Sequence, residues 1–238
     1  MKKLLFLLGL LTFNANATEV KIFKEYSYDM HKLDFQKKFW NFGECQFSMG
    51  ENKLCAERGF ENLYGIPFNI TVYFDNDRTK TILLKTPDPI NKKTYLELFR
   101  GMIKSGFELY EIKDQDSALN LYEEIFNGRL KDFGPSADAK LDKLEAEEKE
   151  NNSAILYYME HNKAQQTLKS SKGLSSFSSF LSKLPKDTRF VEMKVNNYKG
   201  IYSLELHFTI PNMTLSQILC KHPFQLNGDR LGDHQNQS

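Results

Sequence analysis

The sequence predicts an α+β fold with an antiparallel or mixed sheet, built from two hairpin-plus-helix halves that follow a cleaved signal peptide. Residues 68–74 alternate apolar and polar side chains, which is typical of a half-buried strand, and residues 201–210 repeat this pattern. Each stretch lies beside a turn-forming segment, at 75–78 and at 196–200, and therefore predicts a hairpin. The aromatic content of 13%, with 19 Phe and 11 Tyr, favours a packed fold over a disordered chain.

Residues 1–17 have the three-part pattern of a signal peptide. Two lysines are followed by an apolar run at 4–13, and Ala15 and Ala17 then provide the small residues that signal peptidase accepts before its cut. The apolar run is too short to span a bilayer, which takes about 20 residues. We therefore expect cleavage after Ala17 and a soluble mature chain, periplasmic or secreted, with no integral membrane segment.

The rest of the chain divides by composition and by its helix and strand patterns. We expect an N-terminal aromatic and disulfide-loop segment at 18–67, a first α+β half at 68–135, a charged helical connector at 136–152, a second α+β half at 153–227 and a flexible tail at 228–238. The connector carries an excess of acidic residues and few large apolar ones. It is therefore either a solvated surface helix or an acidic docking surface for a basic partner.

Capping residues and apolar spacing predict two helices in the first half. Thr94 and Glu97 have the spacing of a capping box at a helix start, and Gly106 is placed to end that helix. Asp116 is expected to cap a second helix, whose apolar stripe runs through residues 118–126.

In the second half, residues 154–159 form a dense apolar run that predicts a central strand. Glu160 and His161 follow at its end, where site residues often occur in mixed sheets. As sequence neighbours they point to opposite faces if the chain is still extended, which weakens them as a pair. Apolar residues spaced through 174–184 predict a helix that ends at Pro185.

The three cysteines are informative because the chain is expected in an oxidising compartment. Cys45 and Cys55 are only ten positions apart, and a disulfide that closes such a loop contributes about 3 kcal/mol in the chain-entropy model. We favour this pair over either pairing with Cys220, because nearby thiols meet more readily. Cys220 is expected to be a small buried residue rather than a reactive thiol, and its role stays open.

Four aromatic residues, Phe35, Phe39, Trp40 and Phe42, precede the predicted disulfide loop. They form either a small core that anchors an irregular segment or a ligand platform, for carbohydrate among others, centred on Trp40. A tryptophan is large enough to be recruited to packing by default, so we favour the core. Trp40 is kept as the candidate binding residue.

His207 and Glu205 are the strongest acid-base candidates, because they lie two positions apart on one strand face. Glu192 and Lys194 are expected nearby across the hairpin. A solvated sheet face with a cross-strand ion pair would give the same pattern. The sequence has no phosphate-binding glycine loop, nucleophile elbow or histidine pair at metal spacing, so we expect no cofactor and no metal.

Charge and motif content together define the expected function. A formal net charge of +1 gives no basic field that would attract nucleic acid, and we expect no nucleic-acid partner. We expect an exported envelope protein that acts by binding another protein, as an inhibitor or immunity-type protein does. The alternative is a metal-independent envelope hydrolase that uses His207 and Glu205.

Overall fold

The structure is a computed structural model that describes residues 19–45, 52–146 and 152–214. The predicted signal peptide, Cys220 and the predicted tail at 228–238 lie outside the described residues. Within the described part of the chain, no helix is long and apolar enough to cross a membrane.

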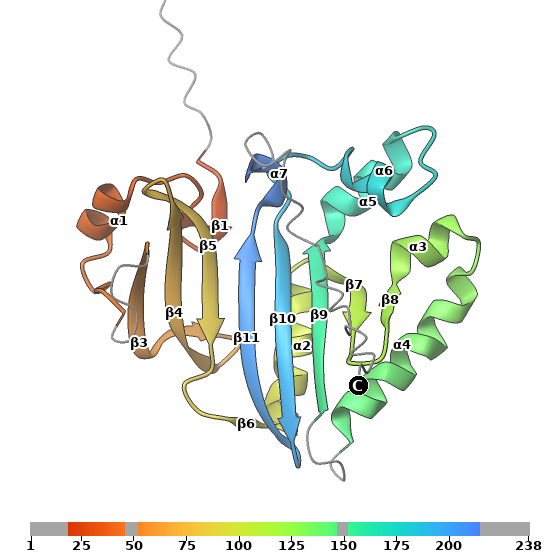
Figure 1. Ribbon diagram of the computed structural model, residues 1–238, viewed down its shortest axis with the longest axis horizontal. Coiled ribbons are helices and arrows are strands. Elements are labelled where there is room, and N and C mark those ends of the chain that lie inside the picture. The colour runs from red at the N-terminus through yellow and green to blue at the C-terminus, as the bar shows by residue number, and fades with distance from the viewer. Residues whose placement is uncertain (1–18, 46–51, 147–151, 215–238) are drawn as a thin grey trace, which may run out of the picture.

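The described residues form a mixed α/β fold around one large antiparallel sheet of nine strands, with seven helices (Figure 1). The strands of this sheet are β3 (Lys53–Leu63), β4 (Ile66–Asp75), β5 (Arg78–Lys85), β6 (Ile90–Asn91), β7 (Phe107–Lys113), β8 (Ala118–Asn120), β9 (Asn152–Glu160), β10 (Phe190–Tyr198) and β11 (Ile201–Thr209). A separate two-stranded sheet pairs β1 (Lys21–Phe23) with β2 (Tyr26–Ser27). The helices are α1 (Lys32–Lys38), α2 (Lys92–Lys104), α3 (Leu121–Phe126), α4 (Leu130–Glu145), α5 (His161–Ser170), α6 (Phe177–Leu181) and α7 (Pro211–Thr214).

The two predicted halves share one sheet, whose strand order is β3-β4-β5-β11-β10-β9-β7-β8, with β6 pairing to β11 outside this path. β5 pairs with β11, and buried Leu84 lies opposite buried Leu206 in that register. At the other side β7 pairs with β9. Strands of the first half therefore flank the second-half strands on both sides.

Both predicted hairpins are present and turn in the same way. Asn76 and Asp77 join β4 to β5 with positive φ angles, and Lys199 and Gly200 do the same between β10 and β11. Two consecutive residues at positive φ match the right-handed twist of the flanking strands, and short polar residues or glycine tolerate that conformation best. The alternating pattern of β11 then buries its apolar face, as predicted.

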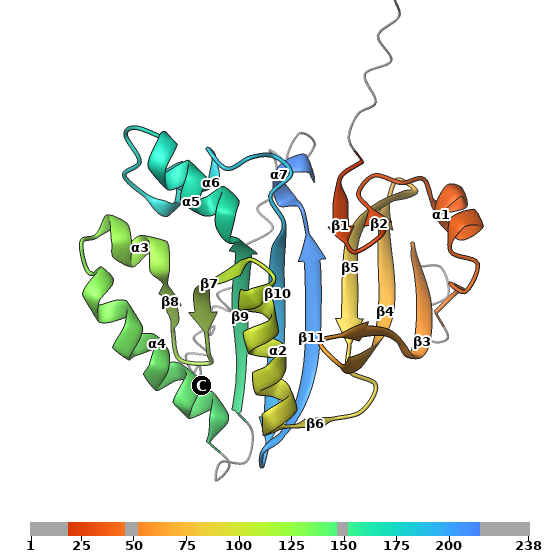
Figure 2. The same ribbon diagram turned by 180° about the vertical axis from the view of Figure 1, so that it is seen from behind.

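Helix α2 covers one face of the sheet, the face turned toward the viewer in Figure 2. Its buried side chains Tyr95, Leu98 and Met102 pack into the main apolar core. The predicted capping box at Thr94 is wrong, because Asn91 caps the helix and its Oδ1 accepts a hydrogen bond from the Thr94 amide at 3.0 Å.

Three further helix predictions need correction. Residues 118–120 form strand β8, and the next helix, α3, is capped by Asn120 instead of Asp116. The connector helix α4 begins at Leu130, six residues before the predicted connector. The short helix α6 lies within the predicted 174–184 segment, whereas α5, directly after β9, was not predicted.

A second, smaller core packs α3, α5 and α6 against the end of the sheet formed by β7 and β9. Tyr122 of α3 stacks on Phe180 of α6, with ring centroids 4.2 Å apart. Ala164 of α5 and Met159 of β9 are fully buried in the same cluster. This packing fixes α3 and α5 beside the start of β7.

Candidate functional site

The aromatic residues in and after α1 build a core in the N-terminal part of the molecule, as the sequence predicts. Phe35 is fully buried, and its ring centroid lies 4.7 Å from that of Phe39 and 5.1 Å from that of Phe42. Tyr26 packs on the same group, 4.9 Å from Phe39. Fixed rings of this kind anchor the chain as it leaves α1.

Trp40 is not part of that core, because 87% of the residue is exposed to solvent. The turn that carries it is held on both sides. On one side Phe39 and Phe42 are anchored in the aromatic core, and on the other Gly43 exchanges two backbone hydrogen bonds, of 3.0 and 2.8 Å, with Cys55. The indole is therefore presented from a fixed segment.

The predicted disulfide between Cys45 and Cys55 is present and fastens the same segment to strand β3. Two other large apolar side chains are exposed at this end of the molecule, Leu33 on α1 and Phe60 on β3. The Phe60 ring lies 5.9 Å from that of Phe42, so it contacts the edge of the aromatic core. We call Leu33, Trp40 and Phe60 the Trp40 surface.

His207 and Glu205 lie on one face of β11, as predicted, but they do not share a hydrogen bond. His207 Nε2 is 4.0 Å from Glu205 Oε2, while Glu205 Oε1 binds Lys85 Nζ at 2.9 Å. That hydrogen bond lowers the pKa of Glu205. Burial, with the charge of nearby Lys194, lowers the pKa of His207. Glu192 lies directly opposite His207 on β10, as expected for the hairpin.

Glu160 and His161, the second pair considered from the sequence, have different partners. Glu160 Oε1 accepts hydrogen bonds from Arg189 at 2.8 and 2.6 Å, and Lys163 Nζ lies 2.8 Å from its Oε2. Burial opposes ionisation of Glu160, but these hydrogen bonds outweigh it and lower its pKa. His161 turns away to Glu108 of β7, whose Oε2 lies 2.5 Å from His161 Nδ1.

Glu108 is held from three sides, and its side chain is only 14% exposed. Besides His161, the Tyr122 hydroxyl donates to Glu108 Oε1, and Gln165 Nε2 donates to Oε2 at 3.3 Å. Burial and the bond to Glu108 raise the pKa of Tyr122, so the phenol stays a proton donor. These three contacts hold the Glu108 carboxylate in place against His161.

The pairing of Glu108 with His161 was missed from the sequence. The two residues are 53 positions apart and meet only because β7 pairs with β9, with Phe107 opposite Glu160. Local periodicity carries no signal for that pairing, so no sequence pattern could have identified Glu108 as the partner.

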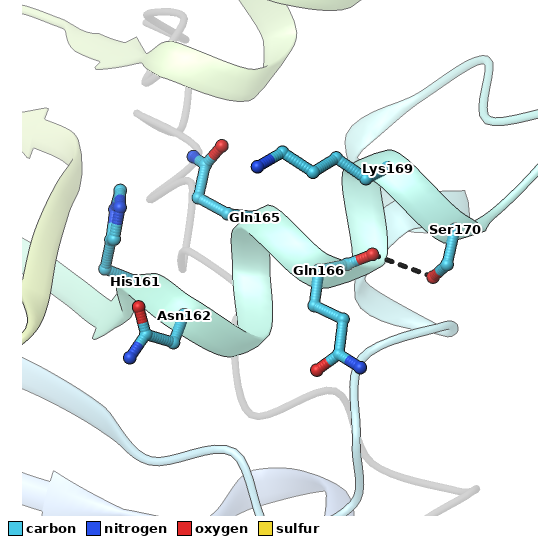
Figure 3. Close-up of a pocket in the computed structure, with 6 residues that line it drawn as sticks. All are labelled: His161, Asn162, Gln165, Gln166, Lys169 and Ser170. Carbon is cyan, nitrogen blue, oxygen red and sulfur yellow. Dashed lines mark hydrogen bonds between the residues drawn. The ribbon is translucent and has the colours of Figure 1, made fainter.

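A hollow of about 480 Å³ lies along α5 beside His161 (Figure 3). Its lining is polar and consists of His161, Asn162, Gln165, Gln166, Lys169 and Ser170. In Figure 3 the side chains of His161, Gln165 and Lys169 follow one side of the helix. The His161 side chain is 51% exposed, so its ring is accessible from the solvent.

Within the described ranges, no group of three His, Cys, Asp or Glu residues is placed to hold a metal ion. Comparison of the chain with models of protein families, with curated proteins and with solved structures gives no match. Three candidate sites therefore rest on their own geometry: the Trp40 surface, the pair of His207 with Glu205 (the His207 pair) and the pair of His161 with Glu108 (the His161 pair).

Proposed function

We propose that this chain is an exported protein of the cell envelope that acts by binding another protein through the Trp40 surface. An inhibitor or immunity-type protein is the concrete form of this proposal. The observation that carries it is the 87% exposed indole of Trp40 on a turn fixed by a disulfide and an aromatic core. Tryptophan is enriched among the residues that dominate binding energy at protein interfaces.

The rigidity of the turn supports the same proposal. A side chain that is already held in place loses little conformational freedom when a partner covers it, so more of the contact energy is available for affinity. Burying the indole in its own protein would stabilise the fold, yet the turn holds it outside while Phe42 fills the core. A recognition role explains this exposure.

Export is supported by the signal-peptide pattern at residues 1–17 and by the disulfide, which persists in oxidising compartments. The mass of the protein purified from envelope or medium tests it directly. We expect a chain that begins at Thr18. A chain that retains Met1 in the cell interior would contradict export.

Site-specific cross-linking tests the binding proposal while the partner is still unidentified. A photoreactive side chain is placed at position 40, and the control carries it at Tyr198, which is also well exposed but lies at the far end of the β10–β11 hairpin. We expect a discrete adduct with one protein from position 40 only. Equal labelling from both positions, or none from position 40, would count against the Trp40 surface.

The hydrolase alternative at His207 and Glu205 remains a prediction, with less support from the geometry. The Glu205 carboxylate is engaged by Lys85, and 4.0 Å separates it from His207. Without a hydrogen bond to the carboxylate, the imidazole of His207 is not oriented by Glu205. Replacing His207 with Ala decides this alternative once a hydrolytic activity is measured. Full retention of that activity in the variant would exclude His207 as the catalytic base.

A further inference from the structure

We infer that His161 is the general base of a hydrolytic site on α5 that takes small esters carrying an anionic group. Its geometry is that of a base held by a carboxylate. Nδ1 is bound to Glu108 Oε2 at 2.5 Å, which leaves Nε2 as the nitrogen open to a substrate or a water molecule. The His207 pair lacks such a bond, with 4.0 Å between its nearest charged atoms.

Glu108 acts as the positioning residue. Its carboxylate is fixed by Tyr122 and Gln165 as well as by His161, and it is nearly buried. A carboxylate so placed keeps the proton on Nδ1 and aims the lone pair of Nε2 outward. Preorganisation of this kind is what a general base requires.

The hollow beside His161 determines the class of substrate. Lys169 lies eight residues further along the same side of α5, about 12 Å along the helix axis. Among the described residues it has no ion-pair partner, so its charge is free to attract an anionic group. A substrate with an ester near His161 and a carboxylate or phosphate near Lys169 matches this spacing.

The start of α5 offers charge stabilisation for the reaction. Its N-cap residue, Glu160, makes no side-chain capping hydrogen bond and is committed to Arg189 and Lys163. The His161 amide is taken by the Gly106 carbonyl at 2.8 Å, so it is not a donor for the substrate. The helix dipole adds a weak positive field near His161, and Lys169 supplies the positive charge for the anionic group.

The reaction needs no cofactor or oxidant. His161 Nε2 removes a proton from water while the water oxygen forms a bond to the acyl carbon. The bond between that carbon and the leaving oxygen then breaks, and the imidazolium returns its proton to the alkoxide. The products are one carboxylic acid and one alcohol, and His161 is restored.

Hydrolysis of 4-nitrophenyl esters by the full mature protein tests this inference, with 4-nitrophenyl adipate as the anionic ester and 4-nitrophenyl acetate as the neutral one. We expect saturable hydrolysis that favours the adipate. His161→Ala should lower kcat/KM at least about 100-fold, the usual contribution of a general base. His31→Asn, which keeps a capping side chain at the start of α1, is the control and should leave the rate unchanged.

Two more variants separate positioning from folding. Glu108→Gln should lower kcat with little change in KM, because the amide keeps the shape but loses the charge that orients His161. Lys169→Ala should raise KM for the adipate and leave the acetate unaffected. Thermal unfolding of each variant establishes that it is folded.

Three results would overturn the inference. The first is hydrolysis that is proportional to ester concentration without saturation and unchanged in His161→Ala, as exposed imidazoles give in general. The second is the absence of hydrolysis above the buffer rate. The third is loss of activity in His207→Ala with His161→Ala unchanged, which would assign the hydrolysis to the other pair. None of these results bears on binding through Trp40.

Discussion

Trp40 and Phe42 lie two residues apart on one turn, and their side chains have opposite environments. Phe42 is 6% exposed and packs edge-on against Phe35, whereas Trp40 is 87% exposed. The turn thus uses one ring to anchor itself and presents the other to the solvent. The contribution to stability and the proposed contribution to binding are therefore separated between these two positions, which makes them a matched pair for mutation.

Replacing Trp40 with Ala should change the free energy of unfolding by no more than about 0.5 kcal/mol, as for an ordinary surface position. Replacing Phe42 with Ala should cost about 3–5 kcal/mol, because it leaves a cavity in the aromatic core. Denaturant unfolding measures both values. Equal losses at the two positions would mean that Trp40 is packed.

Removal of the disulfide by a double replacement of Cys45 and Cys55 with Ser should destabilise the protein by about 2–4 kcal/mol. Cys220→Ser serves as the control for a single cysteine change. Without reduction, a thiol reagent should label neither Cys45 nor Cys55. Labelling of both would contradict the disulfide.

Gly101 on α2 is packed against Tyr64, and a Cβ added there would lie 2.5 Å from atoms of the tyrosine ring. Gly101→Ala should therefore destabilise the protein, although alanine in a helix is favoured over glycine by about 1 kcal/mol. The same replacement in a Tyr64→Ala background is the control, because the ring that the new Cβ would meet is then absent. We expect Gly101→Ala to be neutral or stabilising in that background, and the same sign in both backgrounds would contradict the close packing of α2.

Asp114 and Lys140 tie the β7–β8 turn to α4, with 2.8 Å between Asp114 Oδ2 and Lys140 Nζ. Burial opposes ionisation of Asp114, but hydrogen bonds from Lys140 and from the backbone of Ser117 and Asp116 outweigh it and hold the pKa of Asp114 at about 2. The usual pKa of this carboxyl is 3.8, so the unfolded chain binds the proton more readily.

The stabilisation from Asp114 is therefore complete above about pH 4 and is lost as the pH falls toward 2. We expect its size to be about 1–2 kcal/mol after screening by solvent. Unfolding measured at neutral pH and at several acidic values should show a shallower acid dependence in Asp114→Asn. An unchanged acid dependence would mean that this carboxyl is not perturbed.

The sequence was sufficient for the hairpins because their information is local. Alternation along β4 and β11 and the turn residues between the strands determine which side chains face the core. The sequence was insufficient to predict which strands pair when they lie far apart along the chain. Neither the contact of β5 with β11 nor that of β7 with β9 is encoded in a short pattern, so the single sheet and the Glu108–His161 bond could not be predicted.

One helix, α5, was not predicted, and the placement of Trp40 in the core was wrong, each for a physical reason. α5 buries only Ala164 and Thr167 and so lacks a strong apolar stripe. Trp40 was expected in the core because of its size, but α1 ends at Lys38 and the following turn directs the indole outward. Tertiary packing, which the spacing of residues does not reveal, decides both outcomes.

The affinity for the protein that cross-links at position 40 is the most direct test of binding through the Trp40 surface. Titration of this purified partner into wild type, Trp40→Ala and Tyr198→Ala gives three dissociation constants. A residue at the centre of an interface contributes about 2 kcal/mol or more, so we expect Trp40→Ala to raise Kd at least about 30-fold. Tyr198→Ala should leave Kd unchanged. Equal affinities for wild type and Trp40→Ala would contradict the proposed function.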